Sequence, residues 1–266
     1  MGMPFSAALF LDTPFSGWVF VLCSMIVSVL GLFLVRRRAN VAWLKTQNEV
    51  ASFFFLMVGT LYAVLIAFAI YVVWSQFQDA GTNLEHEAFE IGDLSRMSTA
   101  MPDPLRQNIH NALLEYLHSV VEDEFPAMAE DRDSPRTWNA VQKLWNVYNT
   151  AEVSDPRMQI YYAESLRQLN NICDARRVRL FSSRGTVPPT LWYLLYSGGV
   201  LLIILTYLFG HESFWSQAGM TAALTGVLAF SLFLIVAYNS PYAGAARVSP
   251  APLQFELKLI GAKGTT

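Results

Sequence analysis

Two pairs of residues in the sequence have the side chains that zinc binding or acid–base catalysis requires. His86-Glu87 resembles the start of the zinc motif His-Glu-x-x-His, but position 90 is Glu, so the second histidine ligand is missing. His118 and Glu122 lie four positions apart, so they share one face of a helix and could bind a divalent ion. A solvent-exposed acidic turn is the simpler interpretation of that pair.

Other signatures of catalysis are missing from the sequence. It has no glycine-rich phosphate loop, no Gly-x-Ser-x-Gly motif, and no cysteine with a plausible histidine partner. We therefore predict that the protein is not an enzyme and that it has no catalytic site, no metal site and no cofactor.

A longer set of residues lies along the second apolar segment of the chain and continues beyond it. Steps of four and three positions from Tyr62 give one helical seam that is apolar at first and polar beyond Val72. Several copies of such a helix around an axis would form a hydrophobic constriction opening into an acidic vestibule, an arrangement that favours cations. The predicted pore-lining residues are Tyr62, Leu65, Phe68, Ala69, Val72, Gln76, Asp79, Asn83, Glu87 and Glu90.

Two alternatives to this seam stay open. A seam through Leu61, Leu65, Phe68 and Val72 is bulkier and could equally form the constriction. The polar half could also be an ordinary solvated helix face.

Four arginines before the third apolar segment, Arg176, Arg177, Arg179 and Arg184, are spaced for contact with lipid phosphates. Pairing with the acidic helix of a neighbouring subunit is the alternative role for them.

The composition indicates the elements that must position these residues. Of the 266 residues, 53% are hydrophobic and 15% are charged, a balance that points to a membrane protein. Segments 15–35, 52–74, 190–210 and 217–238 are each long enough to span a bilayer as a helix. None of them contains an ionisable side chain of the kind that proton-coupled transporters use, which favours a channel over a pump. The formal charge of −3 argues against nucleic acid as a partner.

The segment between the second and third spans predicts a helical, water-facing domain. Residues 79–184 carry 17 acidic and 11 basic side chains. Asp103, Ser134 and Asp155 each precede a proline, as N-cap residues often do, and so predict three helix starts. The apolar residues recur at helical spacing behind these starts, including Ile109 to Val120, Trp138 to Tyr148 and Tyr162 to Cys173. No proline lies between Glu49 and Met101, so we expect the second span to continue as one helix to about Met97.

The predicted fold is therefore an all-α membrane protein with four transmembrane helices and a helical aqueous domain inserted between the second and third. The expected domains are a transmembrane hairpin at 1–78, the aqueous domain at 79–184, a second hairpin at 185–240 and a C-terminal tail at 241–266.

Several short motifs resemble the bacterial family described as bestrophin-like, over roughly residues 50–255. They are Gly59-Thr60-Leu61-Tyr62-Ala63, Glu87-Ala88, Gly92-Asp93-Leu94, Glu122-Asp123-Glu124-Phe125-Pro126, Pro188-Pro189-x-Leu191-Trp192 and Tyr207-Leu208-Phe209-Gly210. The segment Asn239-Ser240-Pro241-Tyr242 is similar to the one that follows the fourth span of true bestrophins. The acidic run of their calcium clasp is replaced here by Ala245-Ala246-Arg247-Val248, which argues against calcium control.

This resemblance implies a ring of four-span subunits, pentameric in true bestrophins, with the second spans lining an ion path. It also implies that both termini and the large domain are cytoplasmic, although Arg36, Arg37, Arg38 and Lys45 in the first loop favour the opposite orientation. Bestrophins include anion and cation channels, so only the acidic seam indicates cations.

We predict an oligomeric ion channel of the cell inner membrane, multi-pass and cation-conducting. The predicted partners are further copies of the chain, forming a homo-oligomer that is a pentamer by the resemblance, together with the lipid bilayer and small inorganic ions. The alternative is a non-conducting membrane scaffold or sensor that uses the same helical soluble domain.

Overall fold

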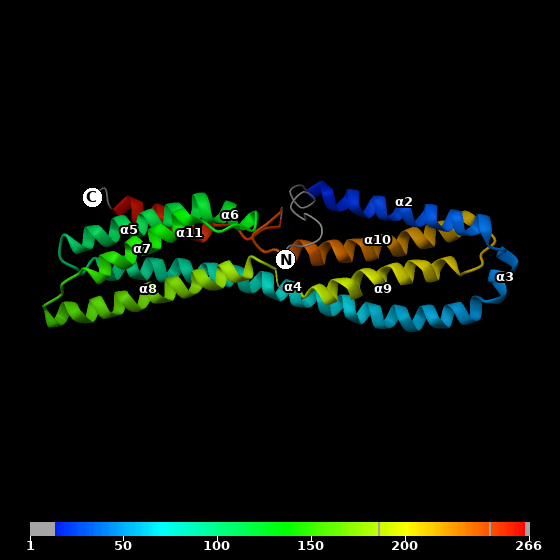
Figure 1. Ribbon diagram of the computed structural model, residues 1–266, viewed down its shortest axis with the longest axis horizontal. Helices are drawn as coiled ribbons and strands as arrows, with labels where there is room; N and C mark the ends of the chain where they lie inside the picture. Colours follow the sequence, from blue (N-terminus) through cyan, green and yellow to red (C-terminus); the bar gives the residue numbers. More distant parts are fainter. Residues whose placement is uncertain (1–13, 186, 245, 264–266) are drawn as a thin grey trace. The chain divides into compact units, whose positions relative to one another are not determined.

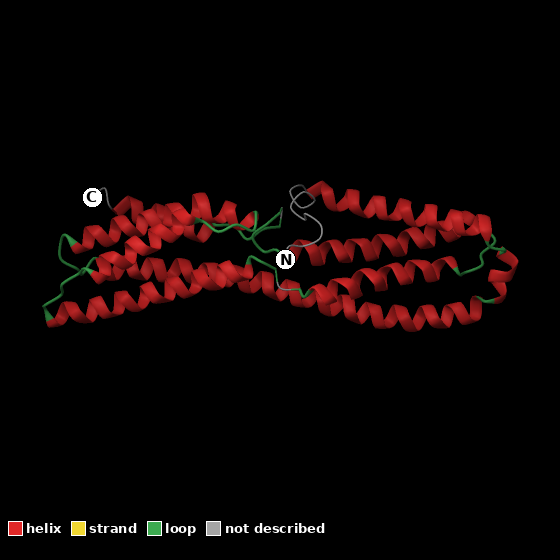
Figure 2. Ribbon diagram, in the orientation of Figure 1, coloured by secondary structure: helices red, strands yellow, loops and turns green. Residues whose placement is uncertain are grey.

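The computed structural model describes residues 14–185, 187–244 and 246–263, and every regular element within these ranges is a helix (Figures 1 and 2). The prediction of an all-α fold is confirmed for these residues. They form two compact units. The span unit contains the described residues up to Ser75 together with 187–239, and the domain unit contains 76–185 together with those after Asn239. The first thirteen residues of the predicted 1–78 hairpin lie outside the described residues.

The span unit is built from apolar helices. Its elements are α2 (Pro14–Arg38), α3 (Val41–Thr46), the first half of α4 (Asn48–Ser98), α9 (Pro189–Tyr207) and α10 (Phe214–Tyr238). Helices α2, α4, α9 and α10 are long and apolar enough to cross a membrane, in agreement with the four predicted spans, although α9 ends at Tyr207 rather than at 210. Only 17–33% of the apolar window of each helix is buried within the chain, so most of its apolar surface faces outward. Such surface is stable against lipid or against another copy of the chain.

The domain unit has shorter helices around its own core. It consists of the second half of α4, α5 (Leu105–Ser119), the π-helical turn η1 (Val120–Glu124), α6 (Phe125–Ala129), α7 (Pro135–Asn149), α8 (Pro156–Ser182) and α11 (Ala251–Lys263). Helix α4 is a single helix of 51 residues that contributes to both units. Its end at Ser98 confirms the expectation that it continues to about Met97.

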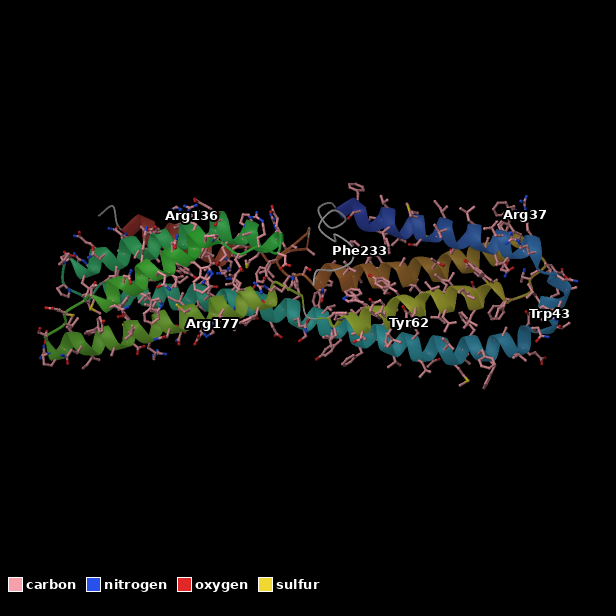
Figure 3. All side chains as sticks on the ribbon, viewed as in Figure 1. Arg37, Trp43, Tyr62, Arg136, Arg177 and Phe233 are labelled. Carbon is pink, nitrogen blue, oxygen red and sulfur yellow. The ribbon has the colours of Figure 1, made fainter. Side chains whose placement is uncertain are left out.

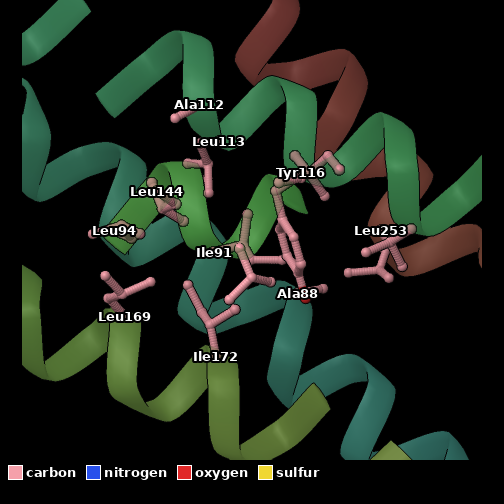
Figure 4. Close-up of a cluster of buried hydrophobic side chains, with 14 of the residues drawn as sticks. Ala88, Ile91, Leu94, Ala112, Leu113, Tyr116, Leu144, Leu169, Ile172 and Leu253 are labelled. Atoms are coloured by element: carbon pink, nitrogen blue, oxygen red, sulfur yellow. The ribbon is translucent and has the colours of Figure 1, made fainter. Parts of the chain in front are cut away.

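Each long helix of the domain unit contributes one or more apolar side chains to its core. Figure 4 shows Ile91 of α4, Tyr116 of α5, Leu144 of α7, Ile172 of α8 and Leu253 of α11 packed together, all of them buried. The predicted apolar stripes therefore do face a core, with one exception. Trp138 is half exposed, and the guanidinium of Arg176 lies over its ring, 4.8 Å from the ring centre.

Two of the three predicted helix starts are confirmed. Ser134 accepts a hydrogen bond from the backbone N–H of Thr137 at 3.1 Å, and Asp155 accepts one from Arg157 at 3.0 Å. The prediction for Asp103 is wrong. Helix α5 begins at Leu105 without a side-chain cap, and the Asp103 carboxylate instead accepts a bond from the guanidinium of Arg106 at 2.7 Å.

Part of the predicted C-terminal tail at 241–266 is helical. Residues Ala251–Lys263 form α11, which packs on α5 and on α4 inside the domain unit. Gly92 of α4 makes room for it, since a Cβ atom there would lie only 3.0 Å from Oε2 of Glu256. The linker before α11 is also anchored in this unit, because the buried Tyr242 hydroxyl donates to the carbonyl of Ala80 at 3.2 Å.

Candidate functional site

Helix α4 has a buried face and a free face in the span unit. Tyr62, Ile66, Ala69 and Val73 are buried against the other helices of the same unit. Leu61, Val64, Phe68 and Tyr71 lie on the other side of the helix and are exposed, Leu61 to 72%. The free face is thus a row of large uncharged side chains that nothing in the described part of the chain covers.

The buried face is held by a close contact with α9. The Tyr62 hydroxyl donates to the backbone carbonyl of Leu195 at 2.5 Å. Its ring fits against two glycines, because a Cβ atom at Gly198 would lie 2.5 Å from the ring, and one at Gly199 would lie 3.0 Å from the hydroxyl. Glycine at both positions is what allows a tyrosine to lie between the two backbones.

This packing corrects part of the predicted pore lining in the span unit. Tyr62 and Ala69 are enclosed by their own chain, so in this conformation they cannot also face a pore. Leu65 and Val72 are half buried at the edge of the free face, and Phe68 is exposed. The alternative seam, with the exposed Leu61 at its start, fits the free face better than the seam through Tyr62.

In the domain unit, the buried face of α4 supplies one member of a network of four charged side chains. Arg179 of α8 donates from Nε to Oε2 of Glu87 at 2.8 Å and from Nη2 to Oε1 at 3.0 Å. The same Nη2 lies 2.8 Å from Oε2 of Glu124, whose carboxylate also accepts bonds from Arg176 at 2.5, 3.1 and 3.2 Å. The Tyr116 hydroxyl donates to Glu87 at 2.7 Å. We call these five residues the ion cluster.

The ion cluster is shielded from water. The side chains of Arg179, Glu87 and Glu124 have 0% exposure, and that of Arg176 has 6%. Burial alone would lower the pKa of Arg179, but the charges of Glu87 and Glu124 outweigh it and hold that pKa well above its ordinary value. Burial, followed by the charge of Glu87, raises the pKa of Tyr116 well above 10. Arg179 therefore stays charged and the tyrosine stays a hydrogen-bond donor.

The cluster depends on a local irregularity in the chain. The π-helical turn η1 ends at Glu124, and this residue is completely buried, although Asp123 next to it is only partly buried and Glu122 is exposed. A π-turn inserts an extra residue into the helical register and so changes the direction in which the following side chains project. The acidic run Glu122-Asp123-Glu124 alone does not indicate which of its carboxylates points inward.

The ion cluster corrects the sequence predictions for Glu87, Arg176 and Arg179. Glu87 does not line an acidic vestibule, because its charge is neutralised inside its own chain. Arg176 and Arg179 are not available for lipid phosphates or for a neighbouring subunit, for the same reason. Arg177 and Arg184 are exposed and pair with Asp174 and Asp133 in the same chain.

The remaining predicted vestibule residues are in different environments. Gln76, Asn83 and Glu90 are partly buried, and Asn83 donates to the carbonyl of Ala175 at 2.9 Å. Asp79 is exposed and forms no ion pair within the described residues. Glu85, which the seam did not include, is likewise exposed and without an ion pair there. The free face of α4 in the domain unit therefore bears Asp79 and Glu85 rather than Glu87.

The His118–Glu122 pair is a surface contact of the domain unit. Nδ1 of His118 lies 3.2 Å from Oε1 of Glu122, and the other carboxylate oxygen lies 3.3 Å from Nη2 of Arg136. The hydrogen bond with His118 and then the one with Arg136 lower the pKa of Glu122. Among the described residues, no group of three His, Cys, Asp or Glu side chains is arranged to hold a metal ion.

Solved structures share this fold. A crystal structure of a bacterial bestrophin homologue from Klebsiella pneumoniae matches with a TM-score of 0.69 and 12% sequence identity, over 90% of this chain and 98% of that chain. A second variant of that homologue gives 0.68 at 13% identity, over 92% and 99%. A structure described only as a membrane protein gives 0.65 at 13% identity, over 91% and 95%. At such identities the likeness concerns the fold.

Comparison at the level of sequence gives one family. No curated protein matches the chain. The family model described as a Bestrophin-like domain matches residues 22–253, which is most of the chain. The resemblance seen in the motifs is thereby confirmed, and the chain belongs to the Bestrophin-like family.

Proposed function

We propose that the protein is the subunit of a homo-oligomeric ion channel in which α4 lines the ion path. Its family and the fold it shares with a bacterial bestrophin homologue support a channel. The observation that carries the proposal is the free face of α4, with large uncharged side chains in the span unit and carboxylates in the domain unit. An apolar ring that opens into a charged, wet region is the physical requirement for a pore that gates by dewetting.

The lining that we propose follows the exposed edge of α4. It comprises Leu61, Leu65, Phe68 and Val72 around the constriction and Asp79 in the wet part. This list keeps four predicted residues that are at least partly accessible, adds the alternative Leu61 and omits Glu87. Gln76, Asn83 and Glu90 are partly enclosed and are not needed for it.

An oligomer is required because one copy of α4 cannot enclose a path. Exposed aromatic side chains on the domain unit support this, since Phe89, Phe181 and Phe255 of this unit are all largely exposed. Uncovered apolar surface of this kind usually marks an interface. A ring of identical subunits covers it by cyclic symmetry. We propose five copies, by analogy with true bestrophins.

The cation preference rests on Asp79, which lies on the same face of α4 as Leu61. Repeated around a ring, this carboxylate, which forms no ion pair within the described residues, would raise the local cation concentration at the mouth of the path. The ion cluster adds nothing to this effect, because its two arginines and two glutamates cancel. The proposed preference is therefore weaker than an entire acidic seam would give, and it should respond to salt, since such charges are screened over about 10 Å at 0.1 M ionic strength.

The decisive experiment measures ion currents from the purified full-length protein in planar bilayers. Leu61→Ala should raise the open current, because a wider apolar passage is wetted more easily. Leu56→Ala is the matched control. Leu56 is 67% exposed against 72% for Leu61, but five positions separate the two, so they project about 140° apart on the helix. Equal effects of the two substitutions, or no current from a protein that forms rings, would contradict the proposal. The second outcome would favour the scaffold or sensor.

Selectivity is tested separately. Asp79→Asn should reduce the cation preference, most clearly at low salt. An anion-selective wild-type current would remove the cation assignment and leave the channel assignment intact.

We also propose that the protein resides in the inner membrane with the domain unit and both termini in the cytoplasm, as the bestrophin order of elements implies. A cysteine placed at the exposed Asn146, in a chain whose Cys23 and Cys173 are replaced by serine, reports the side. It should resist an impermeant thiol reagent in intact cells and react after the cells are opened. Reaction in intact cells would reverse the orientation.

A further inference from the structure

One end of the span unit carries a fixed group of basic and aromatic side chains that the proposed channel function does not use. It is the end where α3 connects α2 to α4 and where α9 turns into α10, and Figure 3 labels Arg37 and Trp43 there. Asn48 holds the α9–α10 turn by two hydrogen bonds, donating to the carbonyl of Gly210 at 3.1 Å and accepting from its N–H at 2.8 Å. This end is therefore a defined surface rather than a pair of loose loops.

Arg36 is part of the framework of this surface. Its guanidinium donates to Oε1 of Gln217 at 3.2 Å and to the backbone carbonyls of His211 at 2.9 Å and Glu212 at 3.3 Å. Lys45 pairs with the carboxylate of Glu212 at 2.6 Å. The carboxylate of the turn is thus already bound to Lys45, and Arg36 is oriented by the chain itself.

The next two arginines are free of such partners. Arg37 and Arg38 are exposed, and neither forms an ion pair with any carboxylate in the described part of the chain. The guanidinium of Arg37 lies over the ring of Phe33, 4.5 Å from its centre. Phe33 in turn packs edge-on against Phe214, with 6.2 Å between ring centres. Arg37 therefore lies beside an apolar aromatic surface at the end of a membrane-spanning helix, and Arg38 adds a second unneutralised positive charge next to it in the chain.

Two tryptophan side chains at the same end of the span unit are also exposed. Trp215 stacks edge-on with Phe214 at 5.5 Å and is 81% exposed, and Trp43 on α3 is also largely exposed. Tryptophan side chains are typical of the depth at which lipid headgroups meet acyl chains. Guanidinium groups bind phosphate with two parallel hydrogen bonds, and resting on an aromatic ring fixes the plane of the group.

We propose that Arg37 and Arg38 bind the phosphate of an anionic phospholipid, with its acyl chains against the surface formed by Phe33 and Trp215. The occupant is a lipid rather than a soluble phosphate, because Arg37 adjoins exposed apolar side chains at the end of a span, which acyl chains would cover. The site belongs to the span unit alone and does not depend on ion conduction.

Native mass spectrometry of the full-length protein in mild detergent tests this site with phosphatidylglycerol as the probe. The wild type should retain phosphatidylglycerol in preference to phosphatidylcholine. Arg37→Gln combined with Arg38→Gln should weaken phosphatidylglycerol binding about fivefold for each charge removed. Arg177→Gln is the matched control, because it removes an exposed arginine of the domain unit, and binding should not change.

Three results would overturn the proposal. They are equal retention of the two lipids by the wild type, unchanged binding in the double variant, and an equal loss in the control. Glycerol phosphate, which has no acyl chains, distinguishes a lipid site from a phosphate site. It should bind far more weakly than the lipid, and equal affinity would also overturn the proposal. Circular dichroism confirms that each variant is folded before its lipid binding is compared.

Discussion

Replacing Arg179 by methionine should destabilise the domain unit strongly, and the geometry of the ion cluster gives the magnitude. Arg179 supplies both nitrogen contacts to Glu87, at 2.8 and 3.0 Å, in a site with no exposure to water. After the substitution, Glu87 would keep only the hydrogen bond from Tyr116. Breaking a buried ion pair on one side costs about 3–5 kcal/mol, because the remaining charge stays buried without compensation.

The neighbouring arginine provides an internal comparison. Arg176→Met also removes a buried guanidinium, but Glu124 would keep the 2.8 Å contact with Arg179. We expect a smaller loss of about 2 kcal/mol, close to the value of hydrogen bonds to a charged group. The order of the two effects follows from the number of partners that each carboxylate retains.

Removing the charge of Glu87 as well should restore stability. Glu87→Leu combined with Arg179→Met leaves Glu124 paired with Arg176, so no buried charge is unpaired. Replacing a buried ion pair by apolar side chains of similar volume is often nearly neutral. The double variant should therefore be more stable than Arg179→Met alone, and the two single variants and the double variant together give the coupling energy.

Thermal unfolding of the full-length protein, followed by circular dichroism in detergent, measures these differences. A loss of 3–5 kcal/mol corresponds to a decrease of about 6–20 °C in Tm for a chain of this size. Hydrogen exchange should locate the change in α4 and α8. The reasoning is refuted if Arg179→Met melts within about 2 °C of the wild type, or if adding Glu87→Leu brings no recovery.

Other contacts give further predictions. Tyr62→Phe should lower the free energy of unfolding by about 1 kcal/mol, the value of one buried hydrogen bond. Gly198→Ala should lower Tm by more than Tyr62→Phe does, because the new methyl group would overlap the Tyr62 ring. Thermal unfolding compares the two variants. Asn48→Ala should speed hydrogen exchange in the α9–α10 turn, since both bonds to Gly210 are lost, and unchanged exchange would contradict the assigned role. Because the pKa of Glu122 is lowered in the folded state, its contribution to stability is present above pH 4.5 and is lost as the pH falls through the folded value. Glu122→Gln should therefore lose less stability than the wild type on acidification below pH 4.5, as measured by unfolding at a series of pH values.

The length of α4 was predictable from the sequence, but which of its faces is buried was not. The absence of proline from Glu49 to Met101 is a local property and correctly predicts one long helix. Which face of that helix is buried depends on side chains far away in the sequence. Tyr62 is buried because Gly198 and Gly199 leave room for it, more than 130 positions later, and the steps of four and three cannot contain that information.

The partners of the buried charged residues were not predictable from local sequence either. Glu87 looks like part of an acidic seam because its partner Arg179 lies 92 positions away on α8. One signal was available in the sequence. Arg176 and Arg179 are three positions apart, so they share a helix face with the apolar Ile172, and arginines beside a core residue on one face suggest buried partners. The π-helical turn that buries Glu124 has no comparable signature.

The distance along the chain between Glu87 and Arg179 also has a consequence for synthesis on the ribosome. At about 5–20 residues per second, roughly 5–18 s separate the appearance of the glutamate from that of its arginine. Helix α5 and the turn η1 are complete within that interval, but Glu124 of η1 still lacks both of its partners, Arg176 and Arg179. The domain core can therefore close only after α8 has been made, and Tyr242 and α11 join it later still. A nascent chain halted before Arg179 should thus be a better chaperone substrate and a better protease substrate than one halted just beyond it.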